Sequence, residues 1–134
     1  MRYVRKKIVF LLAFLCMLLL VGCSNGKETS KYNIEYLNKD KTGIVAVPYD
    51  ASATTKDALI EEFFAALSSD PDNVEYRKPI PNDVEITKYS LDGALLTIYF
   101  DADYLNMKEV EEVLCRAAVV RTMTQISGID CVSF

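Results

Sequence analysis

Alternating apolar and polar residues predict two paired β-strands at the start of the region after position 31. In the segment YNIEYLN (32–38), Tyr, Ile and Tyr occupy alternate positions on one face, as in a strand with one buried side. The segment IVAVPY (44–49) predicts the second strand of this hairpin. Pro48 cannot donate a ladder hydrogen bond, so its strand should lie at a sheet edge or end there. Gly43, in the turn between the strands, is expected to adopt a positive φ.

The segment TTKDALIEEFFAALSS (54–69) predicts an α-helix, because its apolar residues recur at steps of three and four. Thr54 or Thr55 is expected to cap its start. Pro71 disfavours helical geometry at Asp70 and should end the helix. The stripe expected to be buried comprises Leu59, Ile60, Phe63, Phe64, Ala66 and Leu67.

The segment MKEVEEVLCRAAVVRTMTQI (107–126) predicts a second helix, with apolar side chains on two opposite faces. Such a helix is buried around most of its circumference, or its second stripe contacts a partner. Arg121 lies on the side of the first stripe, where it should pair with a nearby carboxylate or mark the edge of a partner surface. The first stripe comprises Val110, Val113, Leu114, Ala117 and Val120, and the second comprises Cys115, Val119, Met123 and Ile126.

Between the helices, the segment 79–100 predicts a β-hairpin with a tight type I′ turn at Asp92–Gly93. The apolar phase changes along its first arm, and a bulge near Lys88 would reconcile the two halves. A last strand is expected within 129–134. The order is thus β-β-α-β-β-α-β, which predicts an α+β fold in which two helices cover a small mixed sheet. Residues 32–134 suffice for one such domain.

The first 22 residues have the pattern of a secretory signal peptide. Four basic residues precede an uncharged run of 14 residues (8–21). That run is short of the roughly 20 residues that a membrane-spanning helix needs, and small residues follow it. Residues 1–22 are therefore expected to be removed on export.

The four residues LVGC (20–23) resemble the lipobox of bacterial lipoproteins. The resemblance implies cleavage before Cys23 and attachment of a diacylglyceryl group to its thiol. Residues 23–31 would then be a lipidated cysteine and a flexible polar tether. The domain at 32–134 would lie close to the outer face of the cell membrane, bound to it through lipid. An uncleaved anchor, with Cys23 incidental, is the alternative.

The region after the predicted signal peptide is acidic, with 11 basic and 19 acidic residues and a net charge of −8. Phosphate groups repel such a protein, so no nucleic-acid partner is expected. The whole chain has no histidine, which excludes Ser-His-Asp and Cys-His catalysis and imidazole metal sites. These kinds of catalysis and metal binding are therefore not expected, and no cofactor is predicted.

Two pairs of carboxylates are candidates for metal binding. Asp101 and Asp103 stand two apart at a predicted strand end, where they can bind a metal or share a proton. A solvated strand end is the simpler interpretation. Asp70 and Asp72 lack the spacing of a calcium loop, so a plain loop is expected there. No metal site is predicted.

Cys115 and Cys131 remain after processing of the leader. An exported protein permits a disulfide between them. Two separate buried thiols are the favoured alternative, because free cysteine packs as a small apolar side chain.

Three ordered segments, GIVAVPYDASATTKDALIEEFFAAL, PIPNDVEITKYSLDGALLTIYFDADYL and AVVRTMTQISGIDCVSF, together cover most of 32–134. They are similar to the GerMN, or germane, domain of the GerM spore germination and sporulation lipoproteins. The resemblance implies a non-enzymatic domain of the cell envelope, related to the ring-building modules of sporulation channels. The best-known members carry two such domains and this chain carries one, so ring assembly or other homo-oligomerisation is left open.

The favoured hypothesis for function is a membrane-anchored lipoprotein whose domain is a protein-interaction module in sporulation or germination. Its partner would be another envelope protein or a peptidoglycan-associated one. The contact surface is expected on the second helix, at Cys115, Val119, Arg121 and Met123, or at an open sheet edge. The alternative is a surface lipoprotein that binds a small ligand or a cell-wall fragment, because its seven tyrosines after Cys23 can stack on sugars or cations.

Overall fold

Two small β-sheets and two α-helices build residues 30–134, the part of the chain that this computed structural model describes. The predicted α+β class is confirmed. The strands, however, divide between two sheets where one was expected. The predicted signal peptide, Cys23 and most of the tether lie outside the described residues.

The first sheet has the strand order β2-β1-β3, and the second has the order β4-β5-β6. In the first sheet the strands are β1 (Tyr32–Asn38), β2 (Ile44–Tyr49) and β3 (Tyr76–Arg77). In the second they are β4 (Ile86–Asp92), β5 (Leu95–Phe100) and β6 (Cys131–Ser133). The helices are α2 (Lys56–Ser68), the 3₁₀ helix η1 (Ala102–Asn106) and α3 (Glu109–Met123). The short elements β3 and η1 were not predicted.

The β1–β2 hairpin forms as expected, but its turn differs. Pro48 lies on β2, which is an edge strand. The positive φ falls on Lys41, at 52°, and the prediction for Gly43 is wrong. The Asn38 side chain explains the difference, because its Oδ1 accepts hydrogen bonds from the backbone N–H groups of Thr42 and Gly43, at 2.8 and 3.2 Å.

The β4–β5 hairpin contains the predicted bulge, since its register shifts between Ile86 and Lys88. Its turn lies one residue later than predicted. Asp92 pairs with Leu95, so the two loop residues are Gly93 and Ala94. Only Gly93 has a positive φ, at 58°, which is the requirement of a type II′ turn rather than I′.

Helix α2 is buried along its predicted stripe. Thr55 caps it, and its Oγ1 accepts a hydrogen bond from the Ala58 N–H at 3.3 Å. Phe63 is fully buried, with its ring edge-on to Tyr32 at 5.2 Å and to Tyr49 at 5.9 Å. Burying such a side chain contributes roughly 2–3 kcal/mol.

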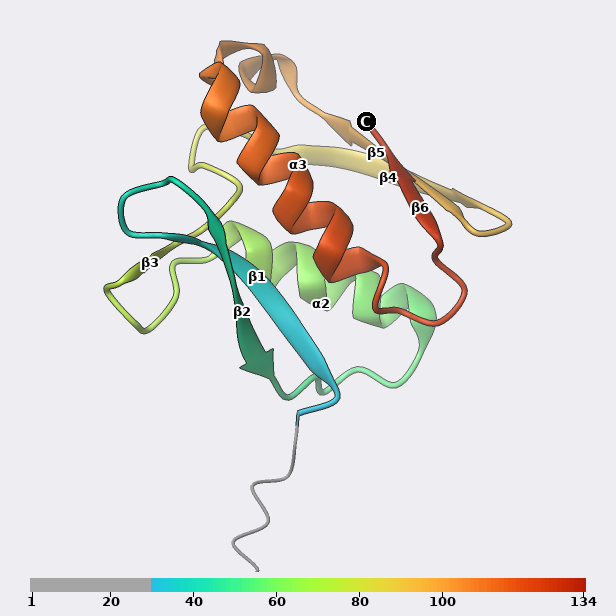
Figure 1. Cartoon of the computed structure of the whole chain (residues 1–134). Coiled ribbons are helices and arrows are strands. Elements are labelled where there is room, and N and C mark those ends of the chain that lie inside the picture. The colour runs from blue at the N-terminus through green and yellow to red at the C-terminus, as the bar shows by residue number, and fades with distance from the viewer. Residues whose placement is uncertain (1–29) are drawn as a thin grey trace, which may run out of the picture.

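Helix α3 lies across the middle of the fold, with the first sheet on one side and the second on the other (Figure 1). It contacts β1, β2, β6 and α2. Both sheets therefore share one core, which α3 closes together with α2.

The connection from β2 to α2 is fastened by one carboxylate. Glu62 Oε1 accepts from the Tyr49 hydroxyl at 3.0 Å and from the Ser52 N–H at 2.9 Å. Glu62 Oε2 accepts from the Ser52 hydroxyl at 3.0 Å and from the Ala53 N–H at 2.7 Å. Burial, followed by the bond to Glu62, raises the pKa of Tyr49 to about 12, so its hydroxyl remains a donor at neutral pH.

Replacing Glu62 by glutamine is expected to lower the free energy of unfolding by about 2 kcal/mol at neutral pH, because one amide oxygen cannot accept all four bonds. The Ser52 N–H is the main cause of a lowered pKa of Glu62 in the folded chain. Its stabilising contribution is therefore complete above the ordinary value of 4.5 and is lost as the pH falls through the folded-state value. Urea unfolding of both chains should show their difference shrinking in acid. A difference that stays constant down to about pH 3 would contradict this assignment.

Candidate interaction surface

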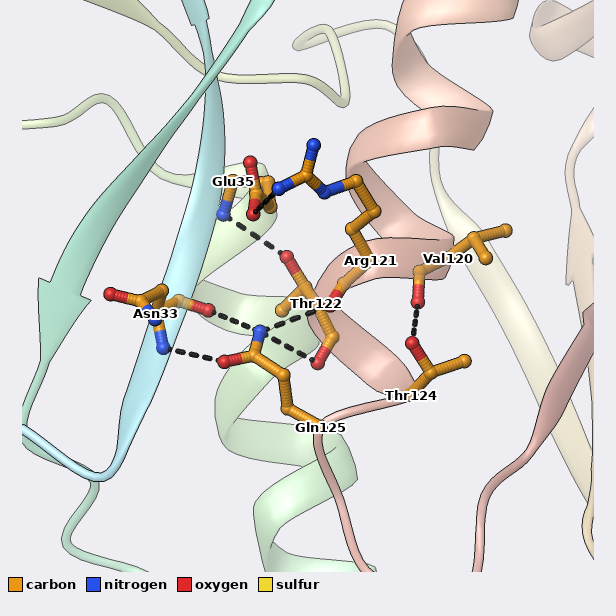
Figure 2. A network of polar contacts seen from close by, with 7 residues as sticks. All are labelled: Asn33, Glu35, Val120, Arg121, Thr122, Thr124 and Gln125. Carbon is orange, nitrogen blue, oxygen red and sulfur yellow. Dashed lines mark hydrogen bonds and ion pairs between the residues drawn. The ribbon is translucent and has the colours of Figure 1, made fainter.

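Thr122 of α3 and Gln125, two residues beyond the helix, close the part of the β1 edge that neither β2 nor β3 pairs with (Figure 2). Gln125 Oε1 accepts from the Asn33 N–H, and Gln125 Nε2 donates to the Asn33 carbonyl, both at 2.8 Å. Thr122 Oγ1 accepts from the Glu35 N–H at 3.1 Å. These backbone groups would otherwise be unpaired, which is costly in a buried strand. The edge of β1 is thus not a surface for strand addition.

The same junction contains Glu35, the ion-pair partner of Arg121. The Arg121 guanidinium lies 3.2 Å from Glu35 Oε1 (Figure 2), so the expectation that Arg121 pairs with a nearby carboxylate is confirmed. Glu35 is only 4% exposed, and its second oxygen is buried without a hydrogen-bond partner. Arg121 is well exposed, so the pair joins a buried carboxylate on β1 to the surface of α3.

The contact surface expected on α3 is wrong for three of its four residues. Cys115, Val119 and Met123 are fully buried in the core, and only Arg121 reaches solvent. The second stripe is the inner one, because it faces the core shared by both sheets. Burial also raises the pKa of Cys115 to about 12, which makes its thiol unreactive at neutral pH.

Two residues of the first stripe are exposed instead, while Leu114, Ala117 and Val120 are half-buried. Val110 and Val113 are 63% and 66% exposed and lie one turn apart on α3. Leu105, on η1 just before the helix, is 84% exposed. We call these three residues the η1–α3 surface. Exposed large apolar side chains on neighbouring elements are candidates for a contact site, and the first-stripe pattern of α3 was the sequence signal for Val110 and Val113.

A polar cluster fastens η1 to α3. The Tyr104 hydroxyl donates to Glu112 at 3.0 Å and accepts from Arg116 Nε at 2.7 Å. Arg116 also pairs with Glu112 at 2.7 Å. Burial is the main cause of the raised pKa of Tyr104, while the bond to Tyr104 is the main cause of the raised pKa of Arg116. The two elements that carry the η1–α3 surface are therefore fixed relative to each other.

The cysteine pair and the carboxylates do not assemble into a chemical centre. Cys115 is a buried free thiol and Cys131 an exposed one, so the disulfide is absent and the alternative of two buried thiols holds only for Cys115. Asp103 accepts a hydrogen bond from Asn106, and Asp70 pairs with Lys78 at 3.2 Å. Within residues 30–134, no group of three or more carboxylate or cysteine side chains could hold a metal ion.

The helices of this region are also too short or too polar to cross a membrane, as far as the described residues extend.

Comparison with known proteins relates this fold to sporulation. The profile of the Germane family, described as sporulation and spore germination, matches residues 34–134. The fold resembles a solved structure, the tandem GerMN domains of the sporulation protein GerM from Bacillus subtilis, with a TM-score of 0.61 and 18% identity. The likeness covers 75% of this chain and 36% of that one, so this chain spans about a third of its length. No match is found among curated proteins. The chain belongs to the Germane family of sporulation and spore germination.

Proposed function

We propose that this protein is an extracytoplasmic lipoprotein whose Germane domain contacts another protein of the cell envelope during sporulation or germination. The family supports the sporulation-related role. The leader and the LVGC (20–23) sequence support export and lipid attachment at Cys23. The η1–α3 surface carries the proposal of contact, since it exposes three large apolar side chains on a rigid support.

A non-catalytic role agrees with the chemistry of the described residues. The chain has no histidine, and Cys115 is buried with its pKa raised to about 12. The strongly bonded groups Glu62 and Tyr104 fasten structural elements to each other. Glu62 and Tyr104 thus have structural roles that do not require a catalytic one.

Binding of a small ligand is supported less well. A cavity of about 320 Å³ lies between the first sheet and the loop before β4. Its charged lining is largely paired internally, with Lys41 on Glu111 at 2.7 Å and Lys78 on Asp70 at 3.2 Å. Paired charges leave few groups to select a solute, so contact with a protein is the better-supported function.

Replacing Val110 and Val113 together by glutamate tests the contact. The two side chains are exposed, so the fold should tolerate the change, whereas charges at the centre of an apolar interface oppose binding by several kcal/mol. In a strain of the native organism that lacks the gene, this variant should yield roughly tenfold fewer heat-resistant spores than the wild-type chain.

The matched control is glutamate at Val74, which is 73% exposed in the loop before β3. It adds charge to an exposed valine outside the η1–α3 surface and should leave the spore yield unchanged. Equal yields from all three chains, at equal protein levels, would contradict the proposed surface.

A further inference from the structure

A second hollow adjoins the η1–α3 surface, between β5 and η1. It has a volume of about 380 Å³. It forms there because β6 pairs only with residues 95–97 of β5, so the last half of β5 has no strand neighbour on that side. The lining comprises Ile98, Tyr99, Phe100, Asp101, Ala102, Tyr104, Leu105 and Phe134. Because Leu105 belongs to both, the cavity and the contact surface are continuous.

Aromatic rings form one wall of this cavity. Phe100 stacks on Tyr104 with their centroids 4.6 Å apart, and on Phe134 at 6.1 Å. The rings already attract a cation from outside, since the Arg116 guanidinium lies 5.8 Å from the Tyr104 ring and 5.2 Å from the Phe134 ring. Arg116 is neutralised by Glu112 at 2.7 Å, so it adds no net charge. The wall therefore favours an apolar stem or a cation.

One charged group in the lining has no partner among residues 30–134. Asp101 makes no ion pair and no side-chain capping bond, and its Oδ1 is buried without a hydrogen bond. Its backbone is fixed, because the Asp101 N–H donates to the Glu85 carbonyl at 2.9 Å. Asp101 is only partly buried as a whole, but an oxygen that loses water and gains no donor is costly to the fold. A cationic donor in the cavity would relieve this after a small rotation of the side chain.

We propose that this cavity receives a lysine or arginine side chain of the partner protein. Such a side chain combines an apolar stem with a cationic head, which matches an aromatic wall beside one unpaired carboxylate. The stem packs against Phe100 and Leu105, and the head pairs with Asp101. The acidic balance of the domain draws such a partner in. The inference deepens the proposed function and rests on it, because it names the chemistry of the same partner.

The test uses the full chain in detergent micelles and two capped pentapeptides, Thr-Val-Lys-Val-Thr and Thr-Val-Gln-Val-Thr. In an NMR titration the lysine peptide should shift the signals of Phe100 and Tyr104. It should bind about tenfold more tightly than the glutamine peptide, because its bond to a carboxylate is charge-assisted. Replacing Asp101 by asparagine should make the two affinities equal.

Asp103→Asn is the control, since it removes the same charge two residues away, outside the cavity lining. It should keep the tenfold preference. Three results would overturn the proposal: the wild-type chain binds both peptides equally, it binds neither peptide, or both variants lose the preference for lysine to the same extent. The proposal would also be overturned if the chain self-associates and Asp101→Asn abolishes this self-association, because the occupant of the cavity would then be a second copy of the chain. If the lysine peptide fails this test but the Val110 and Val113 variant has a spore defect, the proposed function stands without the lysine site. If the lysine peptide binds but that variant has no spore defect, the proposed function is contradicted.

Discussion

Replacing Arg121 by methionine is expected to lower the free energy of unfolding by about 3 kcal/mol. The change leaves the Glu35 carboxylate buried without its countercharge, which costs more than the pair itself contributes. Glu35 is 4% exposed on β1, and the Arg121 guanidinium is its ion-pair partner at 3.2 Å. Methionine preserves the packing of the arginine stem, so urea unfolding at neutral pH should report the charge alone.

A second substitution separates this explanation from a general loss of packing. Adding Glu35→Met to the Arg121 variant removes both charges, and most of the lost stability should return. Lys39→Met is the control for loss of an ion pair at the surface. Lys39 and its partner Glu75, 3.0 Å apart, are both more than half exposed, so the loss should stay below about 1 kcal/mol. A double variant no more stable than Arg121→Met would contradict a buried unpaired charge as the cause.

Replacing Cys23 by alanine is expected to abolish lipid attachment altogether. The thiol is the proposed acceptor of the diacylglyceryl group, and cleavage before residue 23 depends on that group. Cells grown with an alkyne-tagged fatty acid should label the wild-type chain and not the variant. The variant should also be larger on a gel by the 22 residues of its leader.

Cys16→Ala provides the control, because this second cysteine lies within the predicted leader. That chain should be labelled and shortened like the wild type. Label that persists in the Cys23 variant, or a wild-type chain that keeps its leader, would contradict the proposed anchor.

Local signals in the sequence predicted the elements that local physics determines. Helix α2 has one apolar stripe and a threonine cap, and both appear as expected. The proline on β2 placed that strand at an edge. The change of apolar phase near Lys88 predicted a bulge, and the register shifts there. Each of these features depends on residues within a few positions of one another.

Features that depend on distant residues could not be predicted in this way. Helix α3 has two apolar stripes, and periodicity alone does not say which one faces the core. The choice is made by β1, through bonds such as that between Glu35 and Thr122, which are 87 residues apart. The division into two sheets likewise depends on which strands meet. Arg121 was singled out from the helix pattern, but its partner Glu35 is visible only in the fold.

Contact through the η1–α3 surface is the central claim, and site-specific photo-cross-linking in sporulating cells tests it most directly. A photoreactive amino acid at position 113 should yield a discrete cross-linked product with one envelope protein. The same amino acid at position 74, an equally exposed valine in the loop before β3, should yield none. No product at 113, or the same product from both positions, would contradict the claim.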